Sequence, residues 1–200
     1  MNNDFSFSFF KAPVQNIYSD MMLDIKGAYE YISSDVDAMI NTLELRHTIK
    51  KVKEGKCDMD AAREFKKTKL NSVCFSGTFS RRKDEYLIQH SGLICLDFDH
   101  IGGSRELWGL KERLIADPYF TTWLAFVSPS GDGLKWVIGI DISKADHRTW
   151  FRALQNYIRA TYQLEVDPSC INVSRACFLP FDPNCYVHPD ILKDKDVCPF

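Results

Sequence analysis

Residues 5–10 alternate apolar and polar positions, and this period of two is typical of a half-buried β-strand. Further along the chain, short apolar runs bounded by turn residues predict more strands. The predicted strands are residues 5–10, 73–79 with an interruption at Gly77, 92–99, 121–127, 134–140 and 175–180.

Apolar residues spaced three and four apart predict helices over residues 23–33, 36–47 and 58–67. In the second half, Ser104 can cap a helix that ends near Pro118. Ser143 with Asp146 resembles a capping box for a further helix, whose apolar residues between 150 and 158 share one face.

The elements of the second half follow the order β-α-β-β-α-β, which predicts an α+β protein with a ferredoxin-like or RRM-like core over residues 91–200. Residues 1–90 are then a basic N-terminal α/β subdomain, packed on that core as one compact unit. In this topology the first strand lies between the third and the fourth. The end of strand 92–99 should therefore face the segments that enter the two neighbouring strands.

The composition is that of an ordinary globular protein, with 45% hydrophobic and 26% charged residues among 200. The seven cysteines contain no C-x-x-C pair and several stand in apolar context, which favours reduced, buried thiols over a disulfide framework or a zinc site. Apolar runs are too short for a membrane span, and the first residues lack a signal-peptide pattern. We therefore expect a cytoplasmic protein with no membrane partner.

Charge is distributed unevenly along the chain, although the net charge is only −2. Residues 46–83 contain 12 lysines and arginines against four acids, so this stretch carries +8 and the remainder carries −10. A basic region beside an acidic one suits a protein that binds a polyanion and uses a metal. A solvated helical surface with no specific partner explains the basic stretch equally well.

Two aspartates spaced i, i+2 end the apolar run of residues 93–99. On a strand, Asp97 and Asp99 point to the same face, and two such carboxylates are costly to bury without a cation between them. Mg²⁺ commonly binds one or two carboxylates together with substrate phosphate oxygens. The alternative is that the strand simply ends there and that both aspartates are solvated.

A glycine- and serine-rich segment, residues 128–135, precedes the strand that begins at Leu134. Its glycines allow a sharp turn that can aim N–H groups at an anion, and Lys135 adds a point charge suited to phosphate. Alternatively, the segment is a tight hairpin turn with Lys135 on a solvent face.

Asp167 precedes the last predicted strand and offers a third carboxylate, which two-metal phosphoryl chemistry requires. Arg175 could neutralise triphosphate charge with its planar guanidinium. An Asp-Pro turn with a structural arginine–carboxylate pair explains the same residues.

Taken in order, these motifs resemble the archaeo-eukaryotic primase, or primase–polymerase, superfamily. Within it, the chain looks most like the VirE-type N-terminal domain family, which is found ahead of helicase-like regions. That likeness rests on short runs along nearly the whole chain, at residues 9–11, 75–79, 90–94 and 174–175. The motif that usually contains histidine has Lys135 in this chain. Lysine keeps a positive charge near phosphate but cannot act as an imidazole donor, so catalysis could be weakened or altered.

The resemblance implies a nucleotidyltransferase for DNA replication in bacteria or mobile elements, with single-stranded or primed DNA, nucleoside triphosphates and a fused or associated helicase as partners. Asp97, Asp99 and Asp167 would form the catalytic centre and bind Mg²⁺ or Mn²⁺. The implied nucleotide-binding residues are Ser128, Ser130, Gly131, Lys135 and Arg175. The implied nucleic-acid-binding residues are Lys66, Lys67, Lys69, Arg81 and Arg82. The alternatives are a non-catalytic module that binds single-stranded nucleic acid and a metal-dependent nuclease.

Overall fold

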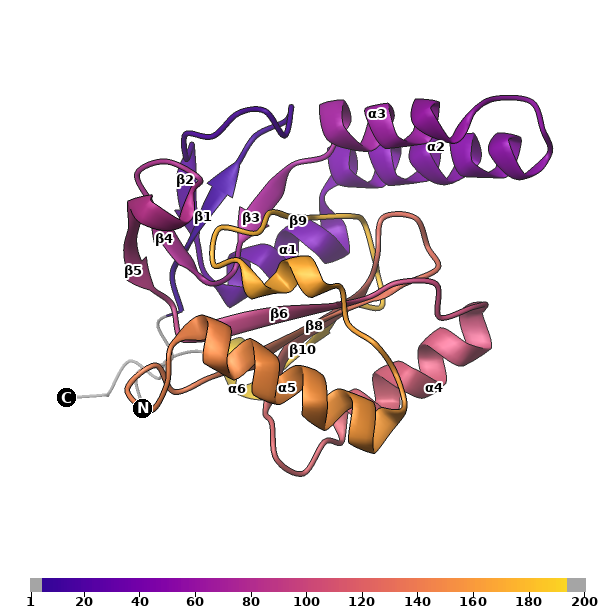
Figure 1. Cartoon of the computed structure of the whole chain (residues 1–200). Helices are drawn as coiled ribbons and strands as arrows, with labels where there is room; N and C mark the ends of the chain where they lie inside the picture. Colours follow the sequence, from indigo (N-terminus) through magenta and orange to yellow (C-terminus); the bar gives the residue numbers. More distant parts are fainter. Residues whose placement is uncertain (1–4, 194–200) are drawn as a thin grey trace.

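The computed structural model describes residues 5–193, and its strands form two four-stranded sheets and one hairpin (Figure 1). The first sheet has the order β2-β1-β3-β9, the second has the order β10-β7-β8-β6, and every pairing is antiparallel. The first sheet contains β1 (Phe7–Phe10), β2 (Met21–Leu23), β3 (Ser72–Cys74) and β9 (Cys177–Phe178). The second contains β6 (Leu93–Phe98), β7 (Thr122–Val127), β8 (Leu134–Gly139) and β10 (Tyr186–Val187).

The separate hairpin pairs β4 (Gly77–Phe79) with β5 (Leu87–His90). The helices are α1 (Ile25–Ser34), α2 (Val36–Lys53), α3 (Met59–Lys69), α4 (Ser104–Ile115), α5 (His147–Tyr162) and α6 (Pro189–Leu192), with short 3₁₀ turns η1 (Asp84–Tyr86) and η2 (Pro168–Ile171). The protein is therefore of the α+β class, as the sequence predicts. No helix within residues 5–193 is long and apolar enough to cross a membrane.

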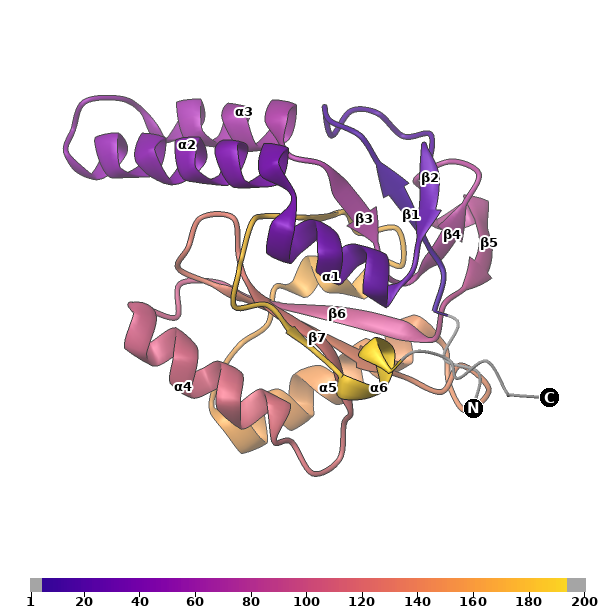
Figure 2. The ribbon, with the colours of Figure 1, turned by 180° about the vertical axis from the view of Figure 1, so that it is seen from behind.

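The second sheet is covered on both faces, which explains its largely apolar strands. Helices α4 and α5 pack on one face, against Ile94, Leu96 and Phe98 of β6 (Figure 1). Helix α1 and the first sheet lie over the other face, which includes Leu93 (Figure 2). Because side chains alternate along a strand, Asp97 belongs to the face that looks toward the first sheet.

The chain follows the expected order β6-α4-β7-β8-α5 and then departs from the predicted topology. The predicted last strand forms as β9, but it pairs with β3 of the first sheet and not with β6. The chain turns at Asp167-Pro168, where the Asp167 N–H donates to the Asp97 carbonyl at 2.9 Å. It then crosses the end of β6 and joins the open edge of β3. The predicted division of the chain after residue 90 stays a prediction, and β9 lies in the sheet built from the first half.

The sequence patterns predicted most helices and strands but placed some of their ends wrongly. Helix α4 follows Gly103, so Ser104 is its first residue and not its cap. Helix α5 is capped by Asp146, which accepts from the Thr149 N–H, whereas Ser143 bonds to Asp141, so the predicted capping box does not form. The interrupted strand at 73–79 is in fact two strands, β3 and β4, which belong to different sheets.

Candidate functional site

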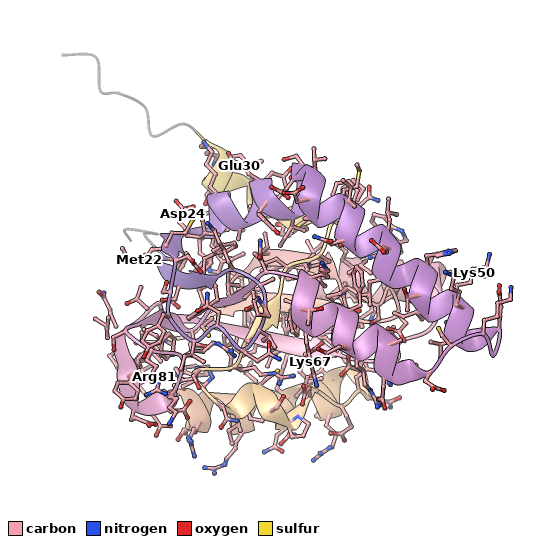
Figure 3. All side chains as sticks on the ribbon, turned by 90° about the horizontal axis from the view of Figure 1, so that it is seen from above. Met22, Asp24, Glu30, Lys50, Lys67 and Arg81 are labelled. Atoms are coloured by element: carbon pink, nitrogen blue, oxygen red, sulfur yellow. The ribbon has the colours of Figure 1, made fainter. Side chains whose placement is uncertain are left out.

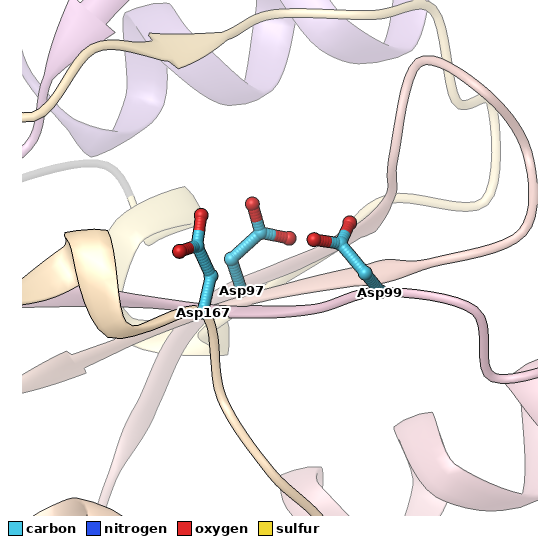
Figure 4. A group of neighbouring side chains, drawn as sticks. All are labelled: Asp97, Asp99 and Asp167. Carbon is cyan, nitrogen blue, oxygen red and sulfur yellow. The ribbon is translucent and has the colours of Figure 1, made fainter.

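The three predicted metal-binding aspartates come together at the end of β6 (Figure 4). Each contributes one carboxylate oxygen, and these oxygens all lie within 4.8 Å of one another. Asp97 is the fifth residue of β6, Asp99 follows that strand, and Asp167 directly precedes η2. The backbone hydrogen bond from Asp167 to Asp97 fixes the third carboxylate beside the first.

Asp97 is the buried member of this acidic triad, with only 6% of its surface exposed. Its Oδ2 accepts a hydrogen bond from Lys135 Nζ, because the antiparallel register places Asp97 opposite Lys135 on β8. Its Oδ1 is buried and has no hydrogen-bond partner among residues 5–193. A buried carboxylate oxygen without a partner is costly, so this atom points to a ligand that completes the site.

Asp167 is held by neighbours on its own segment. Its Oδ1 accepts from the Ser169 N–H at 2.8 Å, and its Oδ2 lies 2.7 Å from Arg175 Nη2. Burial raises the pKa of this carboxyl group, but the Ser169 hydrogen bonds, Arg175 and Lys135 outweigh burial and hold the pKa below its usual value. Asp167 is therefore ionised at neutral pH, as a metal ligand must be.

Two members of the acidic triad open into a cavity of about 480 Å³ with basic walls, which we call the triad pocket. Asp97 and Asp99 line it, and the basic side chains around them are Lys66, Lys67, Arg82, Lys135 and Arg175. Burial, followed by repulsion from Lys135, lowers the pKa of Lys66. The triad pocket therefore has five basic side chains around three carboxylates, so its positive charges outnumber the negative ones.

The glycine-rich segment forms a tight loop at the rim of the triad pocket. Gly131 has φ +85°, a left-handed conformation that favours glycine, and a Cβ on Gly133 would lie 2.5 Å from the Phe98 carbonyl oxygen. The Ser128 hydroxyl accepts from the Gly133 N–H at 3.1 Å. Arg46 anchors the loop from α2, donating to the carbonyls of residues 128 and 129.

The predicted nucleotide-binding residues divide between two cavities. Ser128, Ser130, Lys135 and Arg175 line the triad pocket. Gly131 lines a second cavity on the other side of the loop, and its N–H already donates to the Ser128 carbonyl at 3.0 Å.

The predicted nucleic-acid-binding residues divide in a similar way. Lys66, Lys67 and Arg82 line the triad pocket, whereas Lys69 and Arg81 do not. Arg81 instead lies 5.9 Å from the ring centroid of Tyr86. Figure 3 shows Lys67 on α3 and Arg81 near the hairpin, well separated on this face of the molecule.

Asn172, to which no sequence motif gives a role, lines the triad pocket just after η2. The sequence motifs also do not indicate that Cys95, Cys170 and Cys177 line a small cavity together with Asp97 and Lys135. Cys95 stands two residues before Asp97 on the same face of β6, so its position could have been read from the strand period. The other two depend on where the last segment crosses β6.

A family model described as "BT4734-like, N-terminal domain" matches residues 65–187, a stretch that contains all three aspartates. The chain belongs to this BT4734-like family. The expectation of a primase–polymerase superfamily member, closest to the VirE-type N-terminal domain family, is therefore wrong, because the matching model describes a different family. Comparison with curated proteins and with solved structures finds no match.

Proposed function

We propose that this domain binds a nucleoside triphosphate together with Mg²⁺ or Mn²⁺ in the triad pocket and transfers the nucleotide to a growing nucleic-acid strand. The observation that carries this proposal is the buried Oδ1 of Asp97, which has no partner among residues 5–193. It belongs to a triad in which each carboxylate brings one oxygen within 4.8 Å of the others. This donor set consists of hard oxygen ligands, which suit Mg²⁺ and Mn²⁺.

The roles of the residues follow from charge and exposure. Asp97, Asp99 and Asp167 would hold the cation, which when bound polarises phosphoryl oxygens and favours attack by a hydroxyl group. Lys135, released from Asp97, and Arg175 would bind the triphosphate, since both line the pocket beside the carboxylates. At about 480 Å³ the pocket falls within the usual range for small-molecule sites, roughly 300–1,000 Å³.

A second candidate, a non-catalytic module that binds single-stranded nucleic acid, has one specific observation in its favour. Lys135 pairs with Asp97, and Arg175 pairs with Asp167, so the chain itself neutralises two of the three carboxylates. In that function the basic wall contacts phosphates, and the acidic triad only orients Lys135 and Arg175.

Nucleotide binding separates the two candidates. The affinity of purified protein for a nucleoside triphosphate should rise when Mg²⁺ or Mn²⁺ is added, and Asp97→Asn should lower this metal-dependent affinity by about 100-fold or more. The matched control is Asp60→Asn, an exposed aspartate of α3 that does not line the pocket. The proposed site would be rejected if the affinity for the nucleotide changed neither on addition of the metal nor in Asp97→Asn.

The reaction is tested with a labelled primer on a template, in Mg²⁺ and in Mn²⁺. Metal-dependent lengthening of the primer that is lost in Asp97→Asn/Asp99→Asn supports nucleotidyl transfer. Shorter products that depend on the same residues would instead indicate a nuclease. Salt-dependent strand binding with no product in either metal favours the non-catalytic module.

A further inference from the structure

A second cavity, of about 530 Å³, lies between α2 and α4 on the other side of the glycine-rich loop. We call it the α2–α4 groove. Helix α2 contributes Arg46, Lys50 and Lys53, helix α4 contributes Trp108 and Lys111, and Ser130 and Gly131 of the loop also line the groove. Apart from Ser130 and Gly131, no residue that was given a catalytic or binding role above lines this groove.

The groove carries a positive charge that the protein does not neutralise. Within residues 5–193, Lys50 and Lys53 form no ion pair, and Arg46 donates only to backbone carbonyls. The one acid that lines the groove, Asp182, lies 3.8 Å from Lys111 Nζ and also accepts from the Val127 N–H. Three cations are therefore left facing the groove, and Lys50 stands near the far end of α2 in Figure 3. Such a charge suits an anionic ligand.

Trp108 adds an aromatic surface to this basic groove. It lines the groove and is 48% exposed, although Leu107, Leu110 and Leu114 of the same helix are buried. Lys111 Nζ lies 5.3 Å from the centroid of its ring and helps to hold it in place. An exposed ring beside unpaired cations is the combination that binds single-stranded nucleic acid, because bases stack on the ring while cations contact the phosphates.

The groove and the triad pocket meet at one loop. Ser130 lines both cavities, and Arg46 of the groove holds the loop by donating to the Ser128 and Pro129 carbonyls at 3.3 and 3.2 Å. A strand that occupies the groove can thus pass over this loop to reach the acidic triad.

We propose that the α2–α4 groove binds a single-stranded nucleic acid, with phosphates on Lys50 and Lys53 and a base stacked on Trp108, and that the strand continues over the Ser128–Gly131 loop toward the triad pocket. The continuation of the strand rests on the proposed function, but binding in the groove does not depend on it.

The test measures fluorescence anisotropy of a labelled oligothymidylate of about 12 nucleotides, a length within the usual range of single-strand sites. EDTA is present, so that metal in the triad pocket plays no part. Lys50→Ala/Lys53→Ala should weaken binding about tenfold and reduce the slope of log affinity against log salt by roughly 1.4, the value for two phosphate contacts. Trp108→Ala should weaken binding about tenfold, and Trp108→Phe should restore most of the affinity because the ring is kept.

Two matched controls make the outcome decisive. Lys26→Ala/Lys144→Ala removes two exposed lysines that line neither cavity, and Tyr119→Ala removes an exposed aromatic residue outside the groove. Both should change affinity less than about twofold. The proposal is overturned if the groove variants weaken binding no more than these controls. It is also overturned if polyglutamate of equal charge competes as well as the oligonucleotide, since the groove would then select charge alone.

The same variants separate this inference from the proposed function. Loss of oligonucleotide affinity in Lys50→Ala/Lys53→Ala supports the groove even if Asp97→Asn leaves nucleotide binding unchanged, a result that would reject only the proposed function. If triphosphate binding depends on metal but the groove variants bind the oligonucleotide as the wild type does, the proposed role of the groove is rejected. The proposed function of the triad pocket is then unaffected.

Discussion

Within residues 5–193, two lysine–aspartate pairs lie in largely buried surroundings, and they differ in how completely their polar atoms are hydrogen-bonded. In the first, Asp182 Oδ2 accepts from the Val127 N–H at 2.8 Å and faces Lys111, while Oδ1 accepts from the Asn184 N–H at 3.0 Å. Lys111 also donates to the Asn184 carbonyl. In the second pair, Lys135 reaches only one oxygen of Asp97, and Oδ1 has no partner within residues 5–193.

This difference separates a structural pair from a candidate site. A buried charge that has all its hydrogen bonds stabilises one local arrangement, here the end of β7 against residues 182–184. A buried carboxylate that lacks one, with carboxylate oxygens of Asp99 and Asp167 within 4.8 Å, is more stable once a ligand arrives. Burial of a charge alone therefore does not indicate a functional site, whereas the missing hydrogen bond at Asp97 Oδ1 does.

The largest expected effect is on stability, and it tests the comparison directly. Asp182→Asn should lower the free energy of unfolding by about 3 kcal/mol, because it leaves the ammonium of Lys111 buried without a counter-charge. Asp97→Asn should lower it by less than about 1 kcal/mol without metal, because the amide oxygen still accepts from Lys135 and the crowding of carboxylates is relieved. Chemical denaturation in EDTA measures both, and equal losses would show that the two pairs are alike.

The next effect is stabilisation by divalent cations. Mn²⁺ at about 100 times its dissociation constant should stabilise the wild-type protein by roughly 2.7 kcal/mol, seen as a rise in melting temperature. Asp97→Asn should abolish this rise, and Asp99→Asn should keep part of it because Asp99 is exposed and water can take its place. Asp182→Asn serves as the control. It should melt lower yet keep the full Mn²⁺-dependent rise, and losing that rise would argue against a separate structural role.

A partly buried pair of histidines is uncharged, and it extends the comparison to pH. His90 Nε2 and His147 Nδ1 lie 3.1 Å apart, His147 Nε2 lies 3.2 Å from the Cys170 carbonyl oxygen, and His90 Nδ1 accepts from the Gly92 N–H at 2.9 Å. These contacts assign both rings as neutral Nε2–H tautomers. Burial, followed by the neighbouring His147, lowers the pKa of His90 to about 4.

The smallest expected effect follows from this shift. Because the folded pKa of His90 lies below the unfolded value near 6.5, the unfolded chain binds more protons between pH 4 and 6.5. The free energy of unfolding should therefore fall as the pH drops through this range, by roughly 1–2 kcal/mol after allowing for the partial exposure of His90. His90→Gln should flatten this dependence above pH 5, as thermal melts at several pH values would show. An unchanged pH profile in the variant would mean that other groups cause the loss.

Much of the candidate site follows from patterns that extend over only a few residues. The strand period places Asp97 and Asp99 on one face, and the glycines at 131 and 133 predict the sharp turn before β8. These features were predictable because backbone geometry and side-chain direction depend on neighbours in the sequence.

Other parts of the site depend on contacts between distant segments. Asp167 reaches the acidic triad because the chain turns across the end of β6, and β9 then pairs with β3, where a closed ferredoxin-like core was expected. Short strands of similar composition can pair with several sheet edges, so the local sequence pattern does not predict which edge each strand joins.

Short sequence patterns were sufficient to predict the α+β class, the shared face of Asp97 and Asp99, and the basic stretch that precedes them. The packing of distant segments brings Asp167 beside Asp97, places Lys135 opposite Asp97, and leaves Asp97 short of a hydrogen bond that Asp182 does not lack. Periodicity is encoded over a few residues, whereas the pairing of sheet edges and the hydrogen bonding of buried polar groups depend on the whole packed chain.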